Sequence, residues 1–145
     1  MIDEIETIPF DKDVHYDTIQ KWWEFYYKDS IIPKDCLPET GCVALKAGKP
    51  AGCSFVYKTD SKIAIMTFCI ADPDLGPLGR TKFIDASAKG VTAMAREFLG
   101  DDGFLWGYTS NATVARIWSQ NGMECVEEAD IFILPFGRTD KDFLE

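Results

Sequence analysis

The sequence predicts an α+β fold in which helices flank a mixed, mostly antiparallel central sheet. Two observations lead to this prediction. Short apolar, β-branched runs bounded by turn residues alternate with segments whose apolar residues recur at helical spacing. One long helical segment lies between two predicted strands, and that order implies one parallel strand pair in an otherwise antiparallel sheet.

The first half of the chain is predicted to form strands around one helix. Residues 4–10 alternate loosely and predict an edge-like strand, and residues 14–28 show the spacing of an amphipathic helix. Residues 29–40 hold two prolines and predict an irregular connection or a short helical turn. Residues 41–46 and 51–58 are predicted strands joined by a hairpin turn.

The second half adds the central strand, the long helix and the chain end. The predicted elements are a strand at 63–71, a helix at 80–99, a strand at 104–109, a helix at 112–120, and a hairpin of 123–127 with 130–136. Gly90 lies inside the long helix at a cost of about 1 kcal/mol relative to alanine, and we expect it to permit close approach to the sheet. Residues 1–137 are predicted to form one domain, with 138–145 as a frayed tail.

The helix at 14–28 is unusually rich in aromatic residues, which are Trp22, Trp23, Phe25, Tyr26 and Tyr27. Packing over a sheet explains them most simply, although their number predicts that some line a groove. The single histidine, His15, is expected on the helix surface.

Charge and composition exclude several classes of function. The net charge of −9 argues against binding of nucleic acid or an anionic membrane, and is compatible with a cationic substrate such as an amine or with solubility alone. No apolar run approaches the ~20 residues of a membrane span. The acidic start of the chain lacks the pattern of a signal peptide, so we expect a cytoplasmic protein.

The cysteines predict neither a disulfide framework nor a metal site. There are five of them, an odd number, with no Cys-x-x-Cys pair, and most lie in apolar runs. His15 has no partner at ligand spacing. We therefore expect no bound metal.

The turn at residues 76–81 separates the central strand from the long helix. A glycine-containing loop at a helix N-terminus presents free backbone N–H groups and the positive end of the helix dipole, which together favour a phosphate. A tight connection that binds nothing is the equal alternative.

The element order resembles the GNAT superfamily of N-acetyltransferases over nearly the whole chain. Family members carry a Gln/Arg-x-x-Gly-x-Gly/Ala loop before the long helix; here Gly79 matches the central glycine, with Gly76 and Thr81 in the flanking positions. They also tend to show an Asn and then a short helix ending in Tyr-x-x-x-Gly-Phe, and this chain has Asn111 followed by residues 118–123, Trp-Ser-Gln-Asn-Gly-Met. The turn at 46–52 and the stretch 57–61 look like those of small acetyltransferase-like proteins of bacteriophages.

The resemblance implies acetyl-CoA as the cofactor and a site on both sides of the turn. The pyrophosphate would lie on the amides of residues 78–81, which are Leu78, Gly79, Arg80 and Thr81, with Arg80 and Lys82 near the anionic groups. The pantetheine arm would run along Phe68, Cys69 and Ile70, where the parallel pair of strands 63–71 and 104–109 splays apart. A backbone N–H near Phe68 or Cys69 would polarise the thioester carbonyl. Asn111 and Arg116 would lie near the cofactor.

The departures from the family pattern concern catalysis. Trp118 stands in the position of the usual general-acid tyrosine and has no usable acid. The central strand offers no carboxylate before Asp72, so the candidate bases are Asp72, Asp60 and Glu39. Cys69 as a nucleophile is a further option.

Two functions follow as expectations. The first is an enzyme that transfers acetyl from acetyl-CoA to an amine of a small molecule or a protein. The alternative is a non-catalytic member of the fold that serves a phage as an accessory or virion-associated module. A homodimer or a phage or host protein is a conceivable partner in either case.

Overall fold

The computed structural model describes residues 4–28, 30–127, 132, 134 and 136. The elements within these ranges are β1 (Thr7–Pro9), α1 (Lys12–Tyr26), a 3₁₀ turn η1 (Lys34–Cys36), β2 (Gly41–Lys46), β3 (Lys49–Lys58), β4 (Ile63–Ala71), α2 (Pro77–Leu99), β5 (Phe104–Gly107) and α3 (Ala112–Gln120). The strands form one sheet in the order β1-β2-β3-β4-β5. Neighbours are antiparallel except β4 and β5, which are parallel. The predicted α+β fold with a mixed sheet is confirmed.

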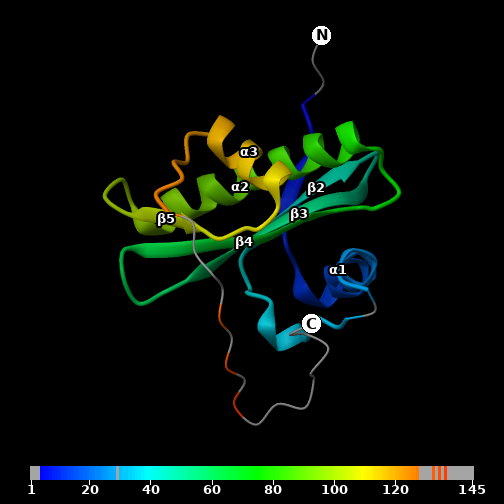
Figure 1. The fold of residues 1–145 in the computed structure, drawn as a ribbon, viewed down its shortest axis with the longest axis horizontal. Coiled ribbons are helices and arrows are strands. Elements are labelled where there is room, and N and C mark those ends of the chain that lie inside the picture. The colour runs from blue at the N-terminus through cyan, green and yellow to red at the C-terminus, as the bar shows by residue number, and fades with distance from the viewer. Residues whose placement is uncertain (1–3, 29, 128–131, 133, 135, 137–145) are drawn as a thin grey trace.

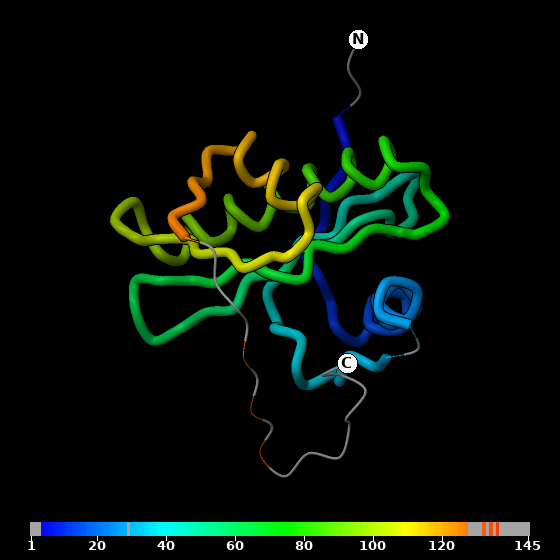
Figure 2. Tube along the Cα trace, viewed as in Figure 1, coloured from blue at the N-terminus to red at the C-terminus, as the bar shows by residue number. Residues whose placement is uncertain are grey.

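The sheet is the middle of three layers. In Figure 1, α2 and α3 cover one face of it and α1 covers the other, and the tube in Figure 2 shows the same division, with α1 viewed almost along its axis. Each face has its own apolar core. Ile19, Trp22 and Phe55 belong to the core under α1, whereas Met66, Val91 and Ile117 belong to the core under α2 and α3.

Two close approaches hold α2 against the sheet. A Cβ on Gly52 of β3 would lie 2.8 Å from the backbone carbonyl of Phe83, and a Cβ on Gly90 would collide with the Cys42 thiol of β2. Neither position therefore accepts a side chain without a shift of the helix. The expectation that Gly90 permits close approach to the sheet is confirmed.

A β-bulge interrupts β4 in its second half. Cys53 pairs with Ile70, but Phe55 pairs with Thr67. Phe68 and Cys69 of β4 therefore together oppose a single residue of β3, Ser54. Phe68 has a φ of 55°, which is rare for a bulky side chain. The bulge reverses the side-chain alternation, because Met66 and Cys69 both join the core under α2 and α3 while Phe68 packs toward α1.

The parallel pair splays apart beside this bulge. Its register runs from Ile63 with Phe104 to Met66 with Gly107 and then stops, while β4 continues to Ala71. The second half of β4 therefore has no partner on its β5 side among the described residues. This gap positions the candidate site.

Several predicted boundaries are wrong. The long helix begins at Pro77 and not at residue 80, because proline at the first helical position needs no N–H partner. The fifth strand ends at Gly107 and not at residue 109, since pairing with β4 stops there. Residues 123–127 form no strand; the rest of the predicted hairpin falls largely, and the tail 138–145 wholly, outside the described residues.

His15 is buried and not on the helix surface. Its Nδ1 accepts the Asp11 N–H (2.9 Å), and its ring stacks on Phe10 with centroids 5.8 Å apart. The helix begins two residues earlier than predicted, at Lys12 and not at Val14, and His15 is buried on the inner side of its first turn. Within the described ranges, no helix is long and apolar enough to cross a membrane.

Candidate functional site

A pocket of about 670 Å³ lies where β4 and β5 separate. Side chains from five elements or connections line it: Trp23, Tyr26 and Tyr27 of α1; Thr67, Phe68, Cys69, Ile70 and Ala71 of β4; Pro77, Leu78, Arg80, Thr81 and Ile84 of α2; Tyr108, Thr109, Ser110 and Asn111 after β5; and Thr113, Val114, Arg116 and Trp118 of α3. Residues of both α1 and α3 line this pocket, although the two helices cover opposite faces of the sheet (Figure 1).

The unpaired edge of β4 presents backbone groups to this pocket. The Asp72 N–H donates to Ala51 O on the β3 side (2.9 Å), whereas Ala71 O faces away from β3 and accepts the Tyr26 hydroxyl (2.8 Å). The N–H and C=O groups of successive residues in a strand point to alternate edges. Because Cys69 and Ala71 are two residues apart, the N–H of Cys69 lies on the same edge as Ala71 O. This N–H follows the bulge and is a donor available to a ligand carbonyl.

The N-terminus of α2 points free N–H groups toward the mouth of the pocket. Gly76 is the N-cap, Pro77 has no N–H, and the Arg80 N–H already donates to Gly76 O (2.9 Å). Of the amides predicted to hold a pyrophosphate, those of Leu78 and Gly79 therefore have no intrahelical acceptor, and those of Arg80 and Thr81 lie within the helix. A Cβ at Gly79 would lie 3.4 Å from Leu75, an ordinary contact distance, so the protein itself leaves room for a small side chain at this position.

The charge of the pocket is opposite to that of the chain. Arg80 and Arg116 line it, and none of the described lining residues is Asp or Glu. Neither arginine lies within 4.0 Å of a described carboxylate oxygen, although the Arg80 guanidinium lies near the Tyr26 hydroxyl and acts to lower its pKa. In a chain of net charge −9, the lining of this pocket is locally positive, a charge that favours an anionic ligand.

Trp118 closes the pocket where the strands begin to part. Its side chain is 7% exposed, and its indole Nε1 is the one buried side-chain polar atom without a hydrogen-bond partner in the described part of the chain. An unsatisfied buried donor costs about 1–3 kcal/mol. Burial raises the pKa of the neighbouring Cys69 thiol, and the Ser54 hydroxyl and the Trp118 indole, which lies near the sulfur without meeting the geometry of a hydrogen bond, act in the opposite direction.

The structure brings most of the predicted site residues together around the pocket and leaves three outside the pocket lining. Phe68, Cys69, Ile70, Leu78, Arg80, Thr81, Asn111, Arg116 and Trp118 all line the pocket. Gly79, Lys82 and Asp72 do not. Lys82 is exposed, with its ammonium 5.8 Å from the Phe83 ring centroid, and an oxygen of Asp72 accepts the Asp74 N–H (2.9 Å). Asn111 also caps α3 by accepting from the amides of Thr113 and Val114.

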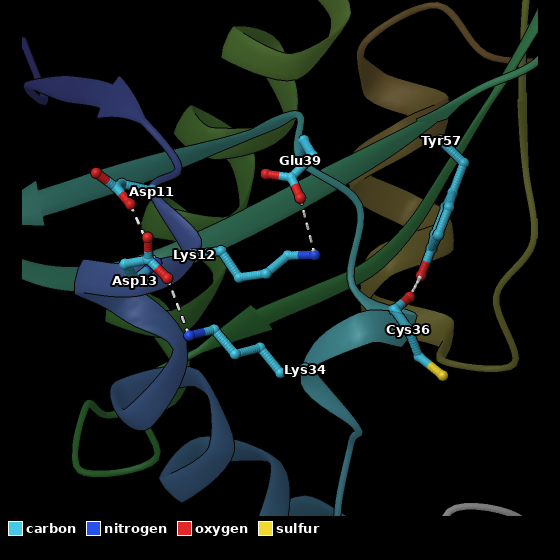
Figure 3. A network of polar contacts seen from close by, with 7 residues as sticks. All are labelled: Asp11, Lys12, Asp13, Lys34, Cys36, Glu39 and Tyr57. Carbon is cyan, nitrogen blue, oxygen red and sulfur yellow. Dashed lines mark hydrogen bonds and ion pairs between the residues drawn. The ribbon is translucent and has the colours of Figure 1, made fainter. Parts of the chain in front are cut away.

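The other two candidate bases lie elsewhere. Asp60 is in the turn between β3 and β4, at the end of β4 opposite the pocket. Glu39 forms an ion pair with Lys12 (3.2 Å) beside the start of α1, in a network that also contains the Lys34–Asp13 pair (Figure 3).

Sequence reasoning did not assign the α1 and β5 aromatics to this site. Trp23, Tyr26 and Tyr27 line the pocket, which confirms that some aromatics of this helix line a groove. Burial raises the pKa of the Tyr26 and Tyr27 hydroxyls. Tyr108 follows the end of β5, and nothing in its local sequence distinguishes it from an ordinary strand residue.

Comparison with known proteins supports the fold. No protein-family model matches the sequence, and no curated protein matches it. Solved structures that resemble it include a probable acetyltransferase (16% identity, TM-score 0.65, covering 94% of this chain and 99% of the other). A second is an aminoglycoside acetyltransferase from an uncultured soil metagenomic sample (15%, 0.63, 91% and 96%). A third is glucosamine-6-phosphate N-acetyltransferase from Arabidopsis thaliana (8%, 0.58, 94% and 100%).

These likenesses extend over nearly the whole of each chain at low sequence identity, so they bear on architecture and not on substrate. The mixed sheet, the splayed parallel pair and the helix placement all agree with them. The chain therefore has the GNAT acetyltransferase fold.

Proposed function

We propose that this protein binds acetyl-CoA in the pocket between β4 and β5 and is an N-acetyltransferase. The observation that carries the proposal is the pocket's composition. Arg80 and Arg116 line it, Leu78 with its free amide lines it at the N-terminus of α2, Trp118 with its unpartnered indole N–H packs beside it, and no described lining residue is acidic. This combination suits a ligand with anionic groups at one end and hydrogen-bond acceptors along its length.

The residues fit the parts of that ligand in order. Arg80 and the amides of Leu78 and Gly79 would hold the pyrophosphate at the mouth, with Arg116 as a second cation and Lys82 as an outer charge. The free edge of β4 at Phe68, Cys69 and Ile70 would pair with the amide groups of the pantetheine arm. Bound acetyl-CoA would supply the activated acetyl group.

The chain's own contribution to the chemistry is orientation and electrostatic stabilisation. The Cys69 N–H would donate to the acyl oxygen, as an oxyanion-hole donor does. The Trp118 N–H would donate a hydrogen bond toward the sulfur. It cannot transfer a proton as a tyrosine would. Holding the amine beside the acyl carbon then provides much of the rate.

Isothermal titration with acetyl-CoA tests the proposal, with desulfo-CoA and ATP as comparators. We expect micromolar binding of acetyl-CoA and desulfo-CoA, and much weaker binding of ATP, which lacks the pantetheine arm. Equal binding of ATP would indicate a nucleotide site, and no binding by the folded protein would show that the loop is only a turn.

The second candidate is a non-catalytic protein of the same fold, a phage accessory or virion-associated module. Trp118 in the general-acid position and the lack of a carboxylate among the described lining residues favour it. Acetylation of any amine by the protein would exclude it. Binding of acetyl-CoA without turnover would support it.

A further inference from the structure

Among the described residues that line the pocket, none can take a proton from an ammonium ion at neutral pH. Its titratable lining residues within the described ranges are Tyr26, Tyr27, Cys69, Arg80, Tyr108 and Arg116. Burial raises the pKa of the Tyr26, Tyr27 and Cys69 side chains, so these groups keep their protons more firmly than usual. Phenols in general are protonated at pH 7, and guanidinium groups are always charged.

The nearest carboxylate does not change this. Asp72 follows Ala71 at the mouth, near the Tyr26 hydroxyl, and one of its oxygens is bonded to the Asp74 N–H. The His15 imidazole faces Asp11 and Phe10 at the start of α1. Among the described residues that line the pocket, a cationic acceptor would therefore meet two guanidinium groups and no carboxylate.

The α1 side of the pocket is aromatic. The rings of Trp23 and Tyr27 have centroids 4.3 Å apart, and the Phe68 ring meets Trp23 edge-on at 5.2 Å. Tyr27 and Tyr108 are 49% and 44% exposed, so their rings are not buried in the core. Such walls favour a flat apolar body that can stack or meet a ring edge.

From these two features we infer that the acceptor is an aromatic amine, whose nitrogen is bonded directly to a ring and is uncharged at neutral pH. The inference rests on the proposed function and names its substrate class. An aromatic amine arrives with its lone pair free, so the missing base is not needed. Its ring would lie against the exposed Tyr27 ring and the half-buried Phe68 ring, behind which Trp23 is buried.

The reaction balances without a protein base. The amine nitrogen forms the new C–N bond with its lone pair while the C–S bond of the thioester breaks. The electron pair of that bond leaves on sulfur. The nitrogen loses one proton to water, and the thiolate accepts one to become the thiol, so no oxidant, reductant or further reactant is required.

The test compares 4-methoxyaniline with 4-methoxybenzylamine and kanamycin. The first two differ by one methylene, which makes the second a basic amine that is charged at pH 7. Binding is measured by saturation-transfer NMR on the protein with CoA bound, and acetylation by mass spectrometry with acetyl-CoA from pH 6 to 9. We expect 4-methoxyaniline to bind and to be acetylated at a rate nearly independent of pH. The benzylamine should be slower at pH 7 and accelerate about tenfold per pH unit, as its neutral fraction does.

Two variants locate the acceptor. Tyr27→Ala should weaken binding of 4-methoxyaniline about fivefold, as loss of one ring contact predicts. Phe25→Ala, on the outer side of the same helix and 61% exposed, should change it less than twofold. Acetyl-CoA affinity should be unchanged in Phe25→Ala, and in Tyr27→Ala any loss of acetyl-CoA affinity should be smaller than the loss of 4-methoxyaniline binding.

The outcomes separate the inference from the function it rests on. Preference for the benzylamine or kanamycin at pH 7 would overturn the aromatic-amine assignment and leave the acetyltransferase intact. Acetyl-CoA binding with no acetylation of the aniline would also overturn it. Failure to bind acetyl-CoA would remove both.

Discussion

Trp118 of α3 packs directly on Gly107, the last residue of β5. A Cβ at position 107 would lie 2.5 Å from Cζ3 and 2.8 Å from Cη2 of the indole. The ring therefore occupies the point at which β4 and β5 stop pairing. Gly107 has no side chain and Trp118 has a large one, and together they set the depth of the pocket.

Replacing that glycine tests this packing. Gly107→Ala should lower the free energy of unfolding by about 1–3 kcal/mol, because the indole must move to admit a methyl group. Urea unfolding measures the change. Gly76→Ala is the control, since a Cβ there meets nothing within 4 Å and the φ of −65° is ordinary. Equal stability of the two variants would contradict the described contact.

The indole N–H can be removed while the aromatic character is kept. Trp118→Phe should weaken acetyl-CoA binding about 5–30-fold, which is the cost of losing one hydrogen bond to an otherwise unpartnered buried donor. Trp118→Tyr should raise kcat with little change in KM, because a phenol can donate a proton to the departing sulfur. Titration calorimetry and steady-state rates separate these effects, and thermal melts identify variants that fail to fold. Full affinity in Trp118→Phe would show that the N–H meets no ligand.

Arg80 is expected to account for much of the anion affinity. Arg80→Ala should reduce acetyl-CoA affinity about tenfold or more, since a charge-assisted hydrogen bond is worth about 1.5–3 kcal/mol. Arg96→Ala changes the same residue type on the same helix about 24 Å away, on an exposed surface, and should have no effect. A similar loss in both variants would mean that long-range charge, and not this site, binds the ligand.

Asp72 was predicted from the sequence as a base, yet its side chain does not line the pocket. Asp72→Asn preserves an acceptor for the Asp74 N–H and removes the charge. We expect kcat to fall less than threefold, against the factor of about 10²–10⁴ typical of a general base. A larger loss, with the pH profile flattened, would restore the original assignment.

The stability of the protein should decrease in alkaline solution. Burial raises the pKa of Cys53, Cys69, Tyr27 and Tyr57. When the pH rises through the ordinary values of ~8.5 for cysteine and ~10 for tyrosine, the unfolded chain releases these protons and the folded chain retains them. The free energy of unfolding must then fall with pH.

Urea unfolding at pH 7, 9 and 10 under reducing conditions measures this fall. Cys53→Ala, which removes the most enclosed thiol, should give a shallower decrease between pH 8 and 10 than the unmodified protein. A stability that is constant over this range would contradict the burial described for these groups.

Much of the fold was predictable because it depends on patterns among residues that are close together in the sequence. The strands at 41–46 and 63–71 and the helix at 112–120 were predicted with their observed bounds, since alternation, helical spacing, Asn111 as a cap and the glycine turns are properties of neighbouring residues. The start of α2 was missed because Pro77 was interpreted as part of a loop, when a proline is equally suited to the first position of a helix.

The sequence by itself determined the order and type of the elements from β1 to α3 and the parallel strand pair. Only the tertiary structure decided what the pocket contains. The bulge at Phe68 depends on strand pairing across the sheet. It determines which residues of β4 face α1 and which face α3. The composition of the whole chain is acidic, whereas the pocket gathers two arginines and, among the described residues, no carboxylate. Local patterns cannot specify this, because the pocket is lined by residues up to 95 positions apart in the chain, from Trp23 to Trp118.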